Sequence, residues 1–214
     1  YKRKYRKILT YTFFVTISFG LLLLCFSSSS NLKLFANEKD FLKIEEYFNS
    51  IKTVKSDFIQ ESSSSLISTG TFFLKKPGKF RFSYDAPFEL EVVSYLQAVL
   101  IFDPKNNDTQ PLTYPISGSP FKYLLKDKFE VNPKSLAQIS TKENILYLEI
   151  NIGNREKNNL SLMFKRNPIR LIGWKLENNI GEVTKINLHN LKVNGYVSDQ
   201  IFNLEEDFKN LKNR

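Results

Sequence analysis

Apolar and polar side chains alternate in short runs over most of the chain beyond residue 53, a period-2 pattern typical of antiparallel strands. The clearest run is residues 80–84, where Phe80, Phe82 and Tyr84 alternate with Arg81 and Ser83. Further strands are predicted over residues 54–60, 66–75, 90–94, 98–102, 145–152, 160–165, 171–176 and 183–193, with a short last strand at 201–204. The pattern therefore predicts about ten strands with short connections, more than a typical sheet holds.

Two segments show helical periodicity instead. Apolar side chains recur at spacings of three and four over residues 38–53, which predicts an amphipathic helix. They are Phe41, Ile44, Phe48 and Ile51. A second, short helix is predicted to begin at residues 119–120, with Ser as its cap and Pro at its first helical position. The apolar face of that helix consists of Phe121, Leu124 and Leu125.

Many strands and few helices, with no alternation of strand and helix, favour an antiparallel meander. A sheet of this size curls, and its concave side encloses either a packed core or a ligand cavity. We therefore predict a mainly β protein with helices, of the α+β class. Its sheet is expected to be strongly curved, with the helices plugging the concave side.

The N-terminus has the layout of a secretory signal peptide: a basic head, an apolar run over residues 8–26, and then small residues. We predict a signal peptide over residues 1–36, cleaved after Ser30 or Ala36, followed by a single domain over residues 37–214. Two alternatives remain. The apolar run is nearly long enough to be an uncleaved anchor, and Cys25 could be lipidated, although the large Leu24 before it argues against that.

The formal net charge of +9 is the first hint of a nucleic-acid partner, but its distribution argues against one. Five basic residues lie within the first seven positions, so that +9 less these five leaves +4 for the remainder, where basic and acidic residues are mixed. Catalytic motifs are also absent: the sequence has no glycine-rich phosphate loop, metal-ligand spacing or nucleophile elbow. The only histidine, His189, is predicted to face solvent on a strand. We therefore expect no nucleic acid, no metal, no cofactor and no enzymatic activity.

The segment Gly70 to Pro87, GTFFLKKPGKFRFSYDAP, resembles the outer-membrane lipoprotein carrier (LolA) family. Residues 54–60, 92–94, 119–125 and 173–174, together with Phe202, are similar to further parts of the family in the right order, so the resemblance covers residues 38–205. It implies an unclosed, strongly curved antiparallel β-barrel with a helical lid. It also implies a monomeric periplasmic chaperone for acylated lipoproteins, which takes them from an inner-membrane ABC lipoprotein-release complex to an outer-membrane lipoprotein receptor.

The resemblance also implies where the acyl chains bind. The cavity wall would comprise Phe72, Leu74, Phe80, Phe82, Tyr84, Val93, Leu100, Phe102 and Trp174, and the lid Phe121, Leu124 and Leu125. For these residues ordinary core packing is the alternative. Lys76 stands where family members often carry an arginine thought to tether the lid through backbone carbonyls, so it is the latch candidate, with a solvated turn lysine as the alternative. Residues 95–96 replace the family's Asp-Gly turn, so that hairpin must be built differently.

Three competing functions stay open at this point. The first is the outer-membrane-anchored lipoprotein receptor of the same fold, which requires lipidation of Cys25. The second is a general lipid-binding module built on the same half-barrel. The third is a hydrolase with an unrecognised site. Bound lipid would separate the binding proteins from the hydrolase, and the chemical state of the N-terminus would separate carrier from receptor.

Overall fold

The computed structural model describes residues 38–105, 111–118, 121–130, 136–152 and 158–204. The chain divides into two compact units, Tyr1–Leu42 and Lys43–Arg214. The predicted signal peptide, its cleavage sites and Cys25 lie outside the described residues. The second unit carries all the strands that the structure describes. Over the described ranges, no helix combines the length and apolar character needed to cross a membrane.

A helix over residues 38–50 leads into eleven strands in the described part of the chain. The strands are β1 (Thr53–Ser62), β2 (Ile67–Lys75), β3 (Lys79–Tyr84), β4 (Glu91–Tyr95), β5 (Ala98–Phe102), β6 (Leu112–Pro115), β7 (Leu136–Lys142), β8 (Ile145–Asn151), β9 (Asn159–Lys165), β10 (Arg170–Glu177) and β11 (Val183–Val193). Between β6 and β7 lie the 3-10 helix η1 (Ile116–Gly118) and the short helix α2 (Phe121–Leu124). A last 3-10 helix, η2 (Asp199–Phe202), follows β11.

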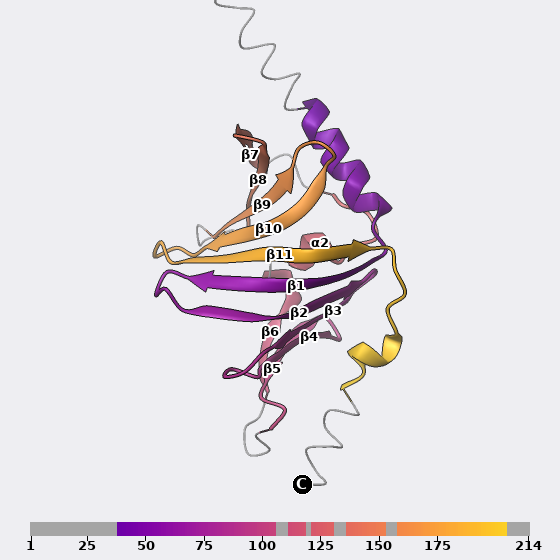
Figure 1. The fold of residues 1–214 in the computed structure, drawn as a ribbon, viewed down its shortest axis with the longest axis vertical. Helices are drawn as coiled ribbons and strands as arrows, with labels where there is room; N and C mark the ends of the chain where they lie inside the picture. The colour runs from indigo at the N-terminus through magenta and orange to yellow at the C-terminus, as the bar shows by residue number, and fades with distance from the viewer. Residues whose placement is uncertain (1–37, 106–110, 119–120, 131–135, 153–157, 205–214) are drawn as a thin grey trace, which may run out of the picture. The chain divides into compact units, whose positions relative to one another are not determined.

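All eleven strands belong to one sheet in the order β6-β5-β4-β3-β2-β1-β11-β10-β9-β8-β7. Consecutive strands pair antiparallel from β1 to β6 and from β7 to β11, and at the centre of the sheet β1 pairs antiparallel with β11 (Figure 1). The strands β6 and β7 follow one another in sequence but occupy the two opposite edges of the sheet. The predicted fold class is therefore confirmed: the sheet is an unclosed, curved, antiparallel meander.

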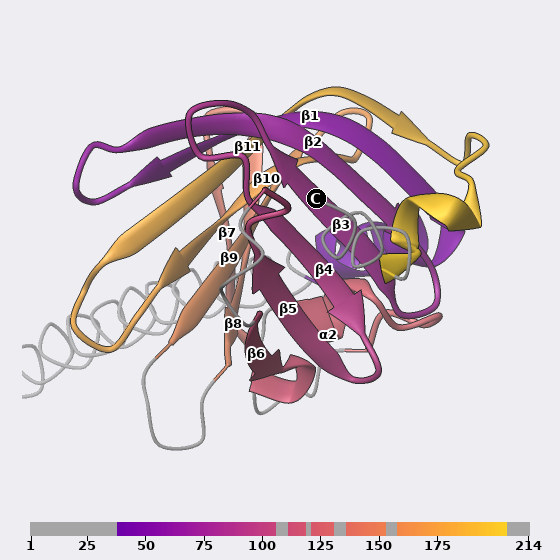
Figure 2. The ribbon, with the colours of Figure 1, turned by 90° about the horizontal axis from the view of Figure 1, so that it is seen from below.

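The curvature of the sheet is visible in the distance between two rings on one face. Phe72 on β2 and Trp174 on β10 are separated by β1 and β11, and in a flat sheet this places their strands about 14 Å apart. Their ring centroids nevertheless lie only 5.8 Å apart. The sheet therefore bends toward the face that bears these rings, which we call the inner face. The curved sheet is seen from below in Figure 2.

Two glycines permit close packing within this bend. Gly70 is the register partner of Phe58, whose ring covers it, and a Cβ at position 70 would overlap the carbonyl oxygen of Ser83. Gly173 has a φ of +150° and lies where the pairing of β10 with β9 shifts register. A Cβ there would overlap the carbonyl oxygen of Ile186. A side chain at either position would therefore push neighbouring strands apart.

Several element boundaries differ from the sequence predictions. The opening helix ends at residue 50 rather than 53, and the predicted strand at 201–204 is wrong, because residues 199–202 form the 3-10 helix η2. The edge strands β6 and β7 were not predicted, since neither shows a clear apolar alternation. The helix predicted from residue 119 is present as α2, although residues 119–120 themselves lie outside the described ranges.

Candidate functional site

The pairing of the strands decides which predicted site residues share a face. Phe72 pairs with Phe82 and Leu74 with Phe80, so these four side chains point to the same side of the sheet. Tyr84 pairs with Gly70 on that side. Trp174 pairs with Ile186, which in turn pairs with Gln60 of β1, and this register places the indole on the inner face as well. The inner-face members of the predicted wall are thus Phe72, Leu74, Phe80, Phe82, Tyr84 and Trp174.

The other three predicted wall residues, Val93, Leu100 and Phe102, lie on the opposite, outer face, which corrects the sequence prediction. Val93 pairs with Arg81 and Leu100 pairs with Val93, so both follow the outward side of β3. They form a buried cluster with Leu204 of the C-terminal segment. On the inner face their places are taken by Val92, Ile101 and Val99, one position away in each strand.

The C-terminal segment covers this outer cluster and is held there by polar contacts. The carboxylate of Asp199 accepts hydrogen bonds from Lys75 at 2.9 Å and Lys79 at 2.7 Å, and these bonds lower the pKa of Asp199 to about 2. Arg81 donates to the carbonyl oxygen of Ile201 at 3.0 Å and pairs with Glu91 at 2.8 Å. The C-terminal segment therefore covers the outer cluster, which explains why the apolar side chains of Val93, Leu100 and Phe102 lie on that face.

Aromatic rings dominate the inner face. The rings of Phe72 and Phe82 stack with centroids 4.4 Å apart, and Phe58 meets Phe82 edge-on at 5.2 Å. Trp174 approaches Phe72 at 5.8 Å and Phe82 at 6.2 Å. Across β8 and β9 the same face continues with aliphatic side chains that are fully buried, among them Leu146, Leu148, Ile150, Leu160 and Leu162. The inner face is thus a continuous apolar surface with an aromatic centre.

The predicted lid residues lie against this aromatic centre. Phe121 of α2 stacks on Phe80 with ring centroids 4.2 Å apart, and it lies 5.6 Å from Phe82 and 6.3 Å from Trp174. Leu124 and Leu125 are buried. The structure therefore brings the lid and wall candidates together, while their part in lipid binding stays a prediction.

Two backbone N–H groups tie the lid segment down. The N–H of Gly78, in the turn between β2 and β3, donates to the carbonyl oxygen of Leu125 at 3.0 Å. The N–H of Phe129 donates to the side-chain oxygen of Asn49 at 2.7 Å, and the Phe129 ring stacks on Phe48 at 4.5 Å. These contacts hold Leu125 and Phe129 in place, at the C-terminal end of the segment that starts with Phe121.

Lys76 is buried, with only 8% of its surface exposed, and is not a solvated turn lysine. Its Nζ donates to the carbonyl oxygen of Phe48 at 2.6 Å. This corrects the latch prediction in one respect: the bound carbonyl belongs to the opening helix, and the tie to α2 comes from Gly78 instead. Burial lowers the pKa of Lys76 to about 8; the nearby Lys52 adds to this effect and Asp127 opposes it.

Several polar side chains on the inner face have hydrogen-bond partners. Tyr84 donates to Gln60 at 2.8 Å, and burial raises the pKa of Tyr84 to about 12. Ser56 donates to the carbonyl oxygen of His189 at 2.7 Å, and Ser94 accepts from the N–H of Phe80 at 2.8 Å. The indole nitrogen of Trp174 is buried without a partner in the part of the chain that the structure describes, as are the hydroxyl of Tyr47 and the side-chain oxygen of Asn158.

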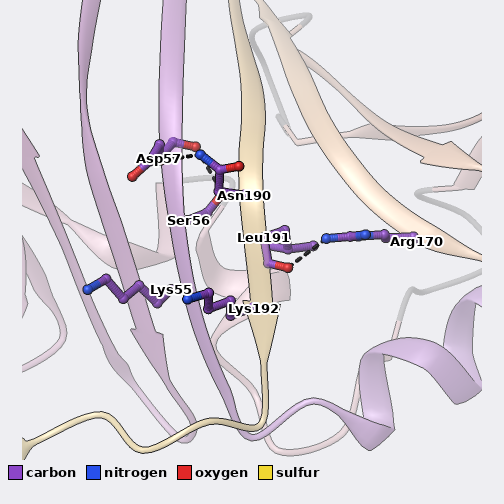
Figure 3. Close-up of a pocket in the computed structure, with 7 residues that line it drawn as sticks. All are labelled: Lys55, Ser56, Asp57, Arg170, Asn190, Leu191 and Lys192. Atoms are coloured by element: carbon purple, nitrogen blue, oxygen red, sulfur yellow. Dashed lines mark hydrogen bonds between the residues drawn. The ribbon is translucent and has the colours of Figure 1, made fainter.

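A polar pocket of about 500 Å³ lies on the outer face, where the pairing of β1 with β11 shifts register (Figure 3). Lys55, Arg170 and Lys192 supply positive charge to its lining. Asn190 donates to the carboxylate of Asp57 at 2.7 Å, and Arg170 donates to the carbonyl oxygen of Leu191 at 2.6 Å. This lining is unsuited to acyl chains, because hydrocarbon gains nothing from contact with hydrated charges.

Within the described ranges, no three His, Cys, Asp or Glu side chains gather where they could hold a metal ion. His189 is exposed on β11, opposite Asp57 in the register of the two strands. The site with a distinctive composition is therefore the apolar inner face and the lid residue stacked on it.

The fold and this face define a half-barrel with an apolar interior. The family model described as "Outer membrane lipoprotein carrier protein LolA" matches residues 49–205, and the chain belongs to this family. Membership indicates a role in binding or carrying lipoproteins, in a family of carriers rather than enzymes.

Individual relatives are distant. An uncharacterized protein of Rickettsia prowazekii is 28% identical over 168 residues, which cover 77% of this chain and 77% of that protein. The outer-membrane lipoprotein carrier protein of Methylococcus capsulatus is 23% identical over 172 residues, or 75% of this chain and 80% of that protein. The crystal structure of a LolA superfamily protein from Nitrosomonas europaea aligns with a TM-score of 0.45 and 12% identity, covering 77% of this chain and 98% of that one.

Proposed function

We propose that this protein is a periplasmic chaperone that binds the acyl chains of lipoproteins against its inner face. In this role it receives lipoproteins from an inner-membrane ABC release complex and delivers them to a receptor at the outer membrane, acting as a monomer. Family membership supports the lipoprotein cargo. The observation that supports this binding site is the stacking of Phe121, the proposed lid residue, on Phe80 at the aromatic centre of the inner face.

The short lid suits a ligand that must be taken up and released. α2 has four residues, far fewer than a helix needs to be stable in isolation. Its position therefore depends on tertiary contacts, among them those of the Phe121 ring with the inner face. An acyl chain gains about 0.8 kcal/mol for each CH₂ group that it buries, so a few methylenes offset the loss of one ring contact. The free-energy difference between the state with the Phe121 ring on the inner face and the state with an acyl chain there is then small, so both uptake and release of the chain are possible.

Replacing Phe121 with alanine tests this exchange. Because the ring competes with the ligand, Phe121→Ala should bind a fluorescent fatty-acid probe about threefold to tenfold more tightly, as expected for the loss of one aromatic contact. Tyr196→Ala is the matched control, since Tyr196 is 94% exposed and therefore does not pack on the inner face. Equal affinity of Phe121→Ala and the control would show that Phe121 does not cover the ligand site.

A second experiment tests the carrier role itself. Detergent-free purification from the periplasm, followed by intact mass spectrometry, should give a processed chain without a covalent lipid, together with co-purifying acylated lipoprotein. The purified protein should also release lipoproteins from inner-membrane vesicles that contain the ABC complex. A diacylglyceryl adduct on Cys25 would instead identify an anchored receptor. A processed chain that releases no lipoprotein would overturn the carrier proposal.

A further inference from the structure

Trp174 is 1% exposed, and its indole nitrogen Nε1 has no hydrogen-bond partner among the residues that the structure describes. The ring lies at the aromatic centre, close to Phe72, Phe82 and Phe121. Aromatic faces are weak hydrogen-bond acceptors, so this environment satisfies the N–H group poorly. Ser56 and Ser94, two other buried polar side chains of the inner face, have hydrogen-bond partners.

An unpaired buried donor is unfavourable and rare in folded proteins. A phenylalanine at position 174 would supply an aromatic ring without this penalty. The indole nitrogen is a donor only and cannot accept a hydrogen bond, so a molecule that satisfies it must bring an acceptor oxygen or nitrogen into the apolar face. A plain hydrocarbon chain cannot do so.

We propose that Trp174 Nε1–H donates a hydrogen bond to the carbonyl oxygen through which an acyl chain is attached, in an ester or an amide. This inference rests on the proposed function and deepens it by naming the chemical group that the inner face recognises. The hydrocarbon tail lies along the phenylalanine rings, and its carbonyl group meets the indole. Phe121 lies 6.3 Å from the Trp174 ring, so displacement of the lid ring opens space beside the indole.

The consequence is selectivity for acyl over alkyl chains. An ester-linked lipid supplies the carbonyl acceptor, whereas an ether-linked lipid with the same chains lacks it. Sites built to hydrogen-bond a ligand discriminate against analogues without that group, because the buried partner is then left unpaired. We expect the wild-type protein to bind dipalmitoylglycerol about tenfold more tightly than dihexadecylglycerol, its diether counterpart.

The chain offers an unusually direct readout, because Trp174 is its one tryptophan. The full mature protein labelled with ¹⁵N has a single indole N–H resonance, which can be followed during titration with each lipid. The diester should move the indole proton downfield, the direction expected for a new hydrogen bond to a carbonyl, and the diether should not. Affinities are measured in parallel by displacement of a fluorescent fatty-acid probe.

Trp174→Phe provides the matched variant, since it keeps an aromatic ring and removes the donor. The tenfold preference for the diester should fall to about onefold, while binding of the diether is retained. Equal binding of both lipids by the wild type, without a downfield shift, would overturn this inference and leave the proposed function standing. Failure of the wild type to bind either lipid would overturn both. If Trp174→Phe does not fold, as judged by circular dichroism, the comparison of the two lipids on the wild-type protein still tests whether Trp174 recognises the carbonyl group.

Discussion

The side-chain nitrogen of Lys76 donates a 2.6 Å hydrogen bond to the carbonyl oxygen of Phe48 and also lies 5.9 Å from the Phe48 ring. Two residues further on, the N–H of Gly78 holds the carbonyl oxygen of Leu125. A single turn between β2 and β3 therefore contacts both the end of the opening helix and the lid segment. Changes in this turn should affect the two together.

The first prediction concerns the pH dependence of folding stability. The pKa of Lys76 is about 8 in the folded protein against 10.5 in the unfolded chain. Between these values the unfolded state binds more protons, so the free energy of unfolding should rise as pH increases from about 8 toward 10. Lys76→Met lacks this contribution, and its stability should be flatter over the same range. Urea unfolding at closely spaced pH values measures both.

Lys76→Arg is the control for this prediction, because the guanidinium keeps its charge throughout the range. Its stability should not rise with pH in the way that the wild type does. Above pH 10 all three proteins should lose stability, since the pKa of the buried Tyr84 is raised to about 12 in the folded state. A wild-type curve identical to that of Lys76→Met between pH 8 and 10 would show that Lys76 titrates normally.

The second prediction separates the two faces of the sheet. Leu100 is buried on the outer face with Val93, Phe102 and Leu204. Leu100→Ala should lower the free energy of unfolding by about 2–5 kcal/mol, the usual effect of a buried leucine-to-alanine change. Because Leu100 does not reach the inner face, affinity for an acyl probe should stay within twofold of the wild type at a temperature where the variant is folded. Chemical unfolding and probe titration check the two parts.

This pair of outcomes would also test the assignment of faces. A large loss of probe affinity in folded Leu100→Ala would return Leu100 to the cavity wall that the sequence resemblance implied. Val92→Ala is the matched variant, since Val92 pairs with Phe82 and occupies the inner face of the same strand pair. It should alter probe affinity more than Leu100→Ala does.

The contrast between β3 and its neighbours shows how far the sequence determines the site. Phe80, Phe82 and Tyr84 alternate strictly with polar residues, so their shared face could be predicted. The outer face of β4 and β5 is also apolar at Val93, Leu100 and Phe102, because Leu204 of the C-terminal segment covers it. Periodicity cannot assign faces in such strands. The unpaired indole of Trp174 was equally inaccessible to sequence reasoning, since it depends on the neighbours that folding brings together.

The third prediction concerns the hairpin between β4 and β5. Tyr95 pairs with Ala98, leaving Leu96 and Gln97 as a two-residue turn with φ values of 44° and 68°. Both values lie in the left-handed region, where Asn and Gly are favoured and leucine is strained. The double change Leu96→Asn with Gln97→Gly should therefore raise the free energy of unfolding by about 1 kcal/mol. Unfolding in urea measures the gain, and no gain would mean that the native turn is unstrained.

The last prediction concerns two positive charges that lie opposite each other on the neighbouring strands β1 and β11. Lys55 and Lys192 are register partners on β1 and β11, and both line the polar outer pocket. Like charges directly opposite one another destabilise a strand pair, whereas opposite charges stabilise it by about 0.2–1 kcal/mol. Lys192→Glu should therefore raise the free energy of unfolding at low salt, and Lys192→Gln should give a smaller gain by removing only the repulsion. Urea unfolding at two salt concentrations checks this, because screening should shrink both gains. If the Glu and Gln variants were equally stable at low salt, the two side chains would be too far apart to interact, and Lys55 would be held by its contact with the Phe73 ring at 5.5 Å instead.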